Sequence, residues 1–271
     1  MVAITQFIVA GLMTAAVQAL PQPQAGSPAP PAQAPAASDK DAADQAKAVL
    51  FQKLFTVPTA VKRFQTLLTQ KVNGEVKLLE GDDLKKQIVF PFTPPPVANQ
   101  TAGGAAVAAN IDTFPILTGL GISTTVGFLQ PCGINTPHVH PRATEFLTVV
   151  DGKNVKFGYV LENGLVSGKN NPEVAGSLQQ FEGTVFPQGS IHFQFNDNCD
   201  QAIFVAALNN EDPGTNQVAQ GFFNLNAQVV NATLGFPKEI NGKNIEQFKN
   251  TIPPNLAQDV QVCLARCNKK N

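Results

Sequence analysis

All three histidines of this 271-residue chain lie where they could bind one metal ion. His138 and His140 are two residues apart, and residues so spaced on an extended strand point to the same side. Glu145 follows Pro141, which favours a bend that turns the carboxylate back toward the histidines. His192 lies in a second strand-like segment. Three imidazoles and one carboxylate suit a divalent transition metal (zinc, iron or manganese) with one or two positions left for water or substrate.

A plainer explanation competes with the metal site. A single histidine on an apolar strand is usually a hydrogen-bonded core residue, and a His-x-His pair alone is a weak motif. All the histidines, however, fall in two matching strand-turn contexts. In the second, His192 and Gln194 share the side of the strand opposite Ile191, Phe193 and Phe195. This pattern favours the metal site, with Gln194 as an outer partner of a ligand or bound water.

The segments around these residues are predicted to form β-strands. Short β-rich runs are separated by clusters of Gly, Pro, Asn and Asp, and no comparable helical pattern intervenes. These features predict an antiparallel sandwich or barrel, so the fold class is mainly β with helices added at both ends. The expected strands are residues 122–129, 146–150, 155–161, 191–195, 202–208 and 218–226.

The remaining segments have distinct compositions. Residues 1–19 are predicted to be a signal peptide, and residues 20–38 a Pro/Ala-rich disordered linker. A helical extension is expected over 39–72, divided at Pro58 and ended by a turn at Asn73-Gly74. The barrel is expected over 75–235. In a C-terminal helical segment at 240–271, Asn255 is expected to cap a helix whose face carries Leu256, Val260, Cys263, Leu264 and Cys267.

Composition excludes some partners. A formal charge of −1 and only 14% charged residues argue against nucleic acid, and the apolar N-terminal run is too short to span a membrane. The signal peptide predicts secretion. Two N-glycosylation sequons, at Asn99 and Asn231, agree with it.

Four cysteines are an even number, which an oxidising compartment would pair. Three connectivities are open, as is the alternative of free buried thiols. Proximity in sequence favours Cys263 with Cys267, which leaves Cys132 with Cys199. A spacing of four places Cys263 and Cys267 on one helix face, where only a distorted helix end brings the sulfurs into bonding geometry.

Residues 113–231 resemble the germins and germin-like proteins of the cupin superfamily, and also the related spherulins. The resemblance rests on FPILTGLGIS, NTPHVHPRATEFLTVVDG, FPQGSIHFQFN and AALNNEDPG. It implies a jelly-roll β-barrel, secretion with cell-wall association in some members, and a trimer or hexamer clasped by C-terminal helices. It also implies a manganese ion bound by His138, His140, Glu145 and His192.

The chain departs from the germin pattern at several positions. Cys132 and Phe181 stand where the family has glycine, and the N-terminal cysteine pair of germins is missing. The helices of 39–72 and a Cys132–Cys199 bridge could replace that pair. Of two asparagines associated with oxalate, Asn135 matches and the other position is Thr125, which counts against oxalate oxidation.

Three kinds of function remain open. One is a manganese-dependent oxidoreductase that dismutates superoxide or oxidises a small carboxylate such as oxalate. Another is a non-catalytic extracellular wall, spore-coat or stress protein that uses the barrel as a scaffold. A third, less specific hypothesis is binding of a small molecule or sugar in the barrel mouth.

Overall fold

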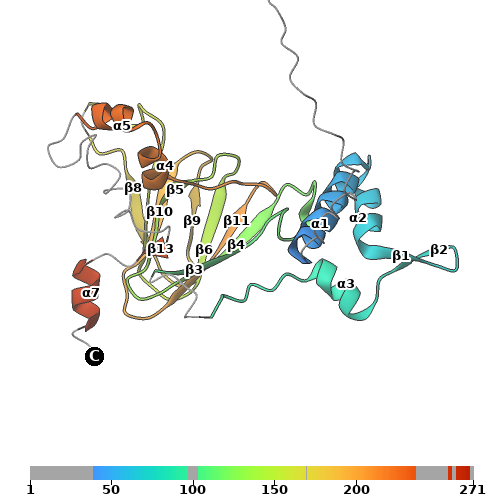
Figure 1. Cartoon of the computed structure of the whole chain (residues 1–271). Helices are drawn as coiled ribbons and strands as arrows, with labels where there is room; N and C mark the ends of the chain where they lie inside the picture. The colour runs from blue at the N-terminus through green and yellow to red at the C-terminus, as the bar shows by residue number, and fades with distance from the viewer. Residues whose placement is uncertain (1–38, 97–102, 169, 236–255, 258–260, 269–271) are drawn as a thin grey trace, which may run out of the picture. The chain divides into compact units, whose positions relative to one another are not determined.

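A computed structural model describes residues 39–96, 103–168, 170–235, 256–257 and 261–268 (Figure 1). The expected signal peptide, the linker, Asn99 and Asn255 lie outside the described residues. The chain divides after Asp44 into two compact units, and the larger unit contains the β-structure. Within the described ranges, no helix is both long and apolar enough to span a membrane.

Two antiparallel sheets form the body of the larger unit (Figure 1). One sheet has the order β3-β4-β11-β6-β9. Its strands are Gly104–Ala109, Ser123–Leu129, Ala202–Leu208, Glu145–Asp151 and Gly183–Phe186. The other has the order β12-β5-β10-β7-β8, with β13 also paired to β5. Its strands are Asn216–Gln217, Ile134–Val139, Ile191–Asn196, Val155–Val160, Val174–Leu178 and Leu256–Ala257. The mainly β class is therefore confirmed.

The core lies between these sheets. Burial alternates along β11 and along β6, as expected for strands with one face turned inward. Leu147 and Val149 of β6 are buried together with Phe204 and Leu208 of β11 and with Leu178 of the opposite sheet. The inner faces of both sheets thus share one apolar core, whose side chains hold the strands that carry the histidines and Glu145.

The N-terminal extension differs in part from the expected helices. Helices α1 (Asp39–Thr56) and α2 (Ala60–Leu68) flank Pro58, and the Thr59 side chain caps α2 by accepting a hydrogen bond from the Lys62 amide. Residues 69–72, expected to be helical, instead form β1 and pair with β2 (Glu75–Leu78). Asn73 and Gly74 have φ of 52° and 86°, so they make a tight hairpin turn rather than a helix end. Helix α3 (Gly81–Ile88) follows.

Two other segments also differ from the sequence prediction. The run 218–226, expected to be a strand, contains helix α4 (Val218–Phe223), and α5 (Ala227–Thr233) follows it. A short apolar run does not distinguish a strand from a helix by its periodicity. The C-terminal helix, α7, spans Gln261–Asn268, whereas Leu256 lies in β13. A short 3₁₀ helix, η2, covers Pro115–Leu117.

The expected cysteine pairing is wrong, although all four cysteines do form disulfides. Cys132 pairs with Cys263 and Cys199 pairs with Cys267. Because Cys263 and Cys267 share one face of α7, both point toward the barrel rather than toward each other. The turns that carry Cys132 and Cys199 are adjacent, since the Cys132 amide donates to the Asn198 carbonyl. Each turn is therefore joined by a disulfide to a different cysteine of α7.

Candidate metal centre

The predicted ligands come from both sheets. His138 lies on β5 directly opposite His192 on β10, and His140 follows β5. The chain then turns at residues 141–142 and enters the other sheet, where Glu145 is the first residue of β6. The expected bend is present. It presents the carboxylate from the facing sheet, which explains how a residue five positions after His140 reaches the same space.

Backbone carbonyls orient each imidazole. The Nδ1 atoms of His138, His140 and His192 lie 2.8, 2.6 and 3.0 Å from the carbonyl oxygens of Thr136, Gly214 and Ser190. Since a carbonyl can only accept, each Nδ1 carries the proton in these contacts and each Nε2 is left with a lone pair. The strands thus set both the tautomer and the direction of three nitrogen ligands.

The ligand atoms converge on one point. One potential ligand atom from each of the three histidines and Glu145 lies within 4.8 Å of every other. Glu145 Oε2 is 2.9 Å from His140 Nε2 and 3.3 Å from His192 Nε2. His192 Nε2 is buried and makes no hydrogen bond to the described residues. This buried lone pair and the mixed nitrogen-oxygen donor set fit a transition metal ion.

The electrostatics favour the protonation state that a metal needs at two of the four residues, His138 and Glu145. Burial and the neighbouring His192 lower the pKa of His138 from 6.5 to about 4. Burial alone would raise the pKa of the Glu145 carboxyl, but the imidazoles of His140 and His192 outweigh it and lower that pKa to about 2. Burial acts to lower the pKa of His140 as well. The contact with Glu145 outweighs burial, so the pKa of His140 is raised. His138 is therefore neutral and Glu145 ionised at neutral pH, as metal ligands must be.

Phe186 is a neighbour that the sequence analysis missed. Its fully buried ring stacks on the His192 imidazole with the centroids 4.4 Å apart and the planes 13° from parallel. Phe157 and Tyr159 meet the Phe186 ring edge-on. Nothing in the sequence pattern pairs residues 186 and 192, because the stacking arises between strands β9 and β10.

A cavity of about 150 Å³ adjoins the ligands inside the barrel. Asn135 and Thr125, the positions discussed for oxalate, both line it. The rest of the lining includes residues that the sequence analysis did not identify: Ala106, Ala108, Phe204, Ala206, Leu208, Thr215 and Gln217. The small alanine side chains of β3 and β11 keep this space open. It can hold a few water molecules or a ligand of similar size.

The half-buried Asn135 and the buried Gln194 form a hydrogen-bonded pair. The Asn135 Nδ2 group donates to Gln194 Oε1 at 2.7 Å, and these residues lie opposite each other on β5 and β10. Gln194 is fully buried, and its Nε2 group has no hydrogen-bond partner among the described residues. A buried amide with two unused protons is costly unless a bound molecule accepts from it.

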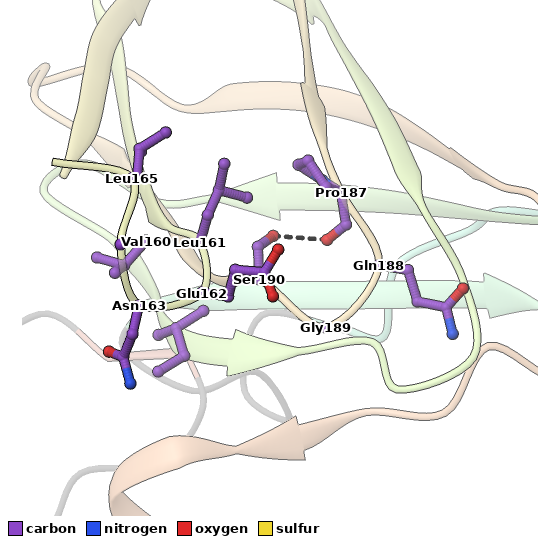
Figure 2. A pocket seen from close by; sticks show the side chains of 11 residues that line it. Val160, Leu161, Glu162, Asn163, Leu165, Pro187, Gln188, Gly189 and Ser190 are labelled. Carbon is purple, nitrogen blue, oxygen red and sulfur yellow. Dashed lines mark hydrogen bonds between the residues drawn. The ribbon is translucent and has the colours of Figure 1, made fainter. Parts of the chain in front are cut away.

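A larger pocket, of about 700 Å³, is formed by residues 160–165 and the turn 187–191 (Figure 2). It contains none of the predicted ligands. Ser190 Oγ donates to the Pro187 carbonyl in this turn, as Figure 2 shows. The same turn serves the metal centre, because the Gly189 amide donates to the His140 carbonyl and the Ser190 carbonyl contacts His192. The candidate ligands therefore border the smaller, inner cavity and not this larger pocket.

Two groups of predicted residues lie away from this centre. The four cysteines join α7 to the turns beside β5 and β10. Asn231, one of the two sequons, is a half-buried residue of α5. Its glycosylation stays a prediction.

Comparison with known proteins places the chain among the cupins. A model of the cupin family matches residues 91–241, more than half of the chain. Spherulin-1A of Physarum polycephalum is 40% identical over 193 residues, which cover 71% of this chain and 73% of the spherulin. Germin-like protein subfamily 2 member 4 of Arabidopsis thaliana is 34% identical over 186 residues, or 68% of this chain and 81% of that protein.

The solved structures agree on the fold. Recombinant oxalate oxidase in complex with glycolate matches with a TM-score of 0.50 and 22% identity, over 68% of this chain and 92% of that chain. At this identity the match shows a shared architecture and carries nothing about substrate.

Proposed function

This chain belongs to the cupin family, among its germin-like and spherulin-type members, and from that premise we propose that it is a secreted manganese protein with redox activity. The three histidines and Glu145 are the proposed ligands. The proposed substrate is a small oxygen species or carboxylate in the inner cavity.

One observation carries this proposal. Three imidazole nitrogens, each held in one tautomer by a backbone carbonyl, converge with a carboxylate beside a cavity of about 150 Å³. A purely structural histidine cluster would fill this space with side chains. Here small side chains leave room for a molecule beside the ligands, which is what a catalytic metal requires.

When bound, manganese supplies one-electron redox chemistry and a position for an oxygen ligand. The protein residues do the rest. The Nδ1 contacts keep the three Nε2 lone pairs directed inward, and Glu145 contributes one negative charge. Asn135 can orient a bound molecule, because it lines the cavity and its amide nitrogen is held in place by Gln194.

Superoxide dismutation suits the cavity better than oxalate oxidation. Thr125 lies in the cavity wall where the germin pattern has a second substrate-binding asparagine. The Thr125 hydroxyl has one donor proton on a shorter side chain, whereas the asparagine amide has two, so the hydroxyl cannot make the same contacts. Dismutation needs only an accessible redox metal and a small diffusing anion, so the loss of that amide leaves it possible.

The second candidate is an extracellular wall, spore-coat or stress protein without catalysis. The Pro/Ala-rich composition of residues 20–38 favours it, because a linker of this composition suits threading into a polymer matrix. The resemblance to germins also supports a homo-oligomer, a trimer or hexamer, which sedimentation would measure.

The first test is elemental analysis of the secreted protein together with a His138→Ala/His192→Ala variant. We expect close to one manganese per chain in the parent and less than ~0.1 in the variant, because two of four ligands are gone. Superoxide and oxalate assays then follow on the metal-loaded protein. Dismutation is expected, and it should be lost with the metal.

An Asn135→Ala variant separates the two proposed reactions. It should keep its manganese, since Asn135 is not a proposed ligand, and keep dismutation, which needs only the accessible metal, whereas any oxidation of a carboxylate should be lost. A parent protein that takes up no manganese, zinc or iron would overturn the metal site. A loaded parent that is inactive in both assays would leave the scaffold as the better function.

A further inference from the structure

The two disulfides lie in contact where α7 meets the barrel. Besides the two bonded pairs, Cys132 Sγ and Cys267 Sγ, which belong to different disulfides, are 3.6 Å apart. The Sγ atoms of Cys132, Cys263 and Cys267 all lie within 4.8 Å of one another. Cys199 is not part of this close group. Three of the four sulfurs are thus placed for exchange without movement of the backbone.

The two disulfides differ in exposure. Cys132 and Cys263 are 0% and 1% exposed, so an external thiol cannot reach their bond directly. Cys199 and Cys267 are both only partly buried. An external dithiol therefore meets the Cys199–Cys267 bond first, since exchange needs direct access to one sulfur.

We propose that these cysteines form a thiol–disulfide exchange site, which takes a dithiol reductant and uses Cys267 as its internal nucleophile. A thiolate of the reductant attacks Cys199 Sγ and displaces the Cys267 thiolate. The second thiol of the reductant then resolves the mixed disulfide, leaving a Cys199 thiol and an oxidised reductant. One dithiol has supplied two electrons.

The internal step follows. The Cys267 thiolate attacks Cys132 Sγ, the Cys132–Cys263 bond breaks, and its electron pair leaves on Cys263, which takes a proton from solvent. The products are a Cys132–Cys267 disulfide and two thiols. A second dithiol reduces that disulfide, and no disulfide then attaches α7 to the barrel.

Arg266 favours the leaving group. Its Nη2 atom lies 3.4 Å from Cys263 Sγ, and Asp197 holds the guanidinium in place through its carbonyl and carboxylate at 2.7 and 2.5 Å. A fixed positive charge stabilises a thiolate, and a more stable leaving thiolate departs faster. The short distance between Cys267 and Cys132 therefore favours the attack, and the charge of Arg266 favours departure of the Cys263 thiolate.

Release of α7 also affects one wall of the inner cavity through the backbone. Strand β13, which precedes α7, pairs with β5 at Ile134 and Asn135. Release of α7 removes the anchor of this pairing beside the residue that lines the inner cavity. The exchange site thus makes the C-terminal segment a clasp that a dithiol can open.

Two matched variants test the internal step. Cys199→Ser leaves Cys267 as a free thiol, within reach of Cys132 and Cys263. Cys267→Ser instead leaves Cys199 as a free thiol, which is not in the group of three close sulfurs. Each folded variant is alkylated after an acid quench and digested with trypsin. Cleavage after Arg266 separates the fragments 250–266 and 267–269, so linkage of either to 87–142 is read directly.

In Cys199→Ser we expect both linkages to 87–142, with the minor one at ~10% or more of the major one, because the exchange is reversible. In Cys267→Ser only the Cys132–Cys263 linkage is expected, with Cys199 alkylated. A single Cys132–Cys263 linkage in both variants would overturn the proposal.

Partial reduction of the parent protein gives an independent measurement, which decides the matter if a variant fails to fold. Brief treatment with dithiothreitol is followed by the same quench, alkylation and digestion. The expected intermediate links 87–142 to 267–269 and carries alkylated Cys199 and Cys263. Intermediates that contain only the original linkages would contradict the proposal.

Discussion

At the scale of single residues, His138 and His140 of the candidate metal centre respond to pH in opposite ways. The folded-state pKa of His138 is about 4, below its usual 6.5, so the unfolded chain binds this proton first as the pH falls. His138 therefore contributes stability that is present above pH 6.5 and lost between 6.5 and about 4. The pKa of His140 is raised, so its contribution is full below 6.5 and is lost as the pH rises through the folded value.

A His138→Gln variant isolates the first effect in the metal-free protein. Between pH 6.5 and about 4, the free energy of unfolding should fall more steeply in the parent than in the variant. The difference should change by at most ~3 kcal/mol, from 1.36 kcal/mol per pKa unit. Urea unfolding at a series of pH values measures it. Parallel curves would show that His138 titrates normally in the fold.

Phe186 is expected to position the His192 ligand. In Phe186→Leu the ring that stacks on the imidazole is lost, and His192 gains freedom to rotate. A stacked aromatic pair is worth ~1 kcal/mol, so manganese affinity should fall by ~5–10-fold in competition with a chelator. Phe157→Leu is the matched control, because Phe157 contacts Phe186 and not the metal ligand. An equal loss in both variants would mean that general packing, not stacking, matters.

At the scale of elements, two turns carry unexpected residues. Cys132 and Phe181, which replace glycines of the germin pattern, have φ of 58° and 67°. Both turns therefore place in the left-handed conformation a residue that adopts it less readily than glycine does. Cys132 is held by its disulfide. Phe181 lies between β8 and β9 with 76% of its surface exposed, so no packing explains it.

Phe181→Gly should stabilise the protein. Relief of the steric strain outweighs the extra entropy of glycine in the unfolded chain, for a net gain of ~0.5–1 kcal/mol in unfolding free energy. Thermal or denaturant unfolding measures the gain. Phe181→Ala, which removes the ring and keeps the strained backbone, should give none. A gain of the same size from alanine would assign the effect to the exposed ring instead.

At the scale of the whole molecule, α7 joins distant parts of the chain. The bridges connect residues 131 and 68 positions apart, so they close long loops in the unfolded state. Such bridges stabilise chiefly by restricting the unfolded chain. All four proposed metal ligands lie in the barrel, apart from α7.

A Cys263→Ser/Cys267→Ser variant, studied with reductant so that the remaining thiols stay free, should lose ~4 kcal/mol or more of unfolding free energy. Its manganese content should stay near that of the parent. Val262→Ser, on the exposed side of α7, is the control and should change neither quantity. A stability loss below ~1 kcal/mol would show that the bridges add little to the fold.

The sequence by itself determined the fold class and the set of residues that meet at the centre. His138 and His140 share a side, and so do His192 and Gln194, because alternation along a strand is a local property. The sequence also predicts the turn at Pro141 and the division of the N-terminal helices at Pro58, because proline restricts the backbone at its own position. None of these inferences depends on which strands are neighbours in the fold.

Only the tertiary structure decided the features that depend on distant contacts. Local spacing suggested a Cys263–Cys267 bridge, but helix geometry directs both sulfurs to the barrel, and the partners are chosen by which turns lie beneath α7. Phe186 meets His192 through packing between strands, and Glu145 arrives from the facing sheet. The run 218–226 was ambiguous because short apolar segments suit a strand or a helix, and the surrounding packing selected the helix.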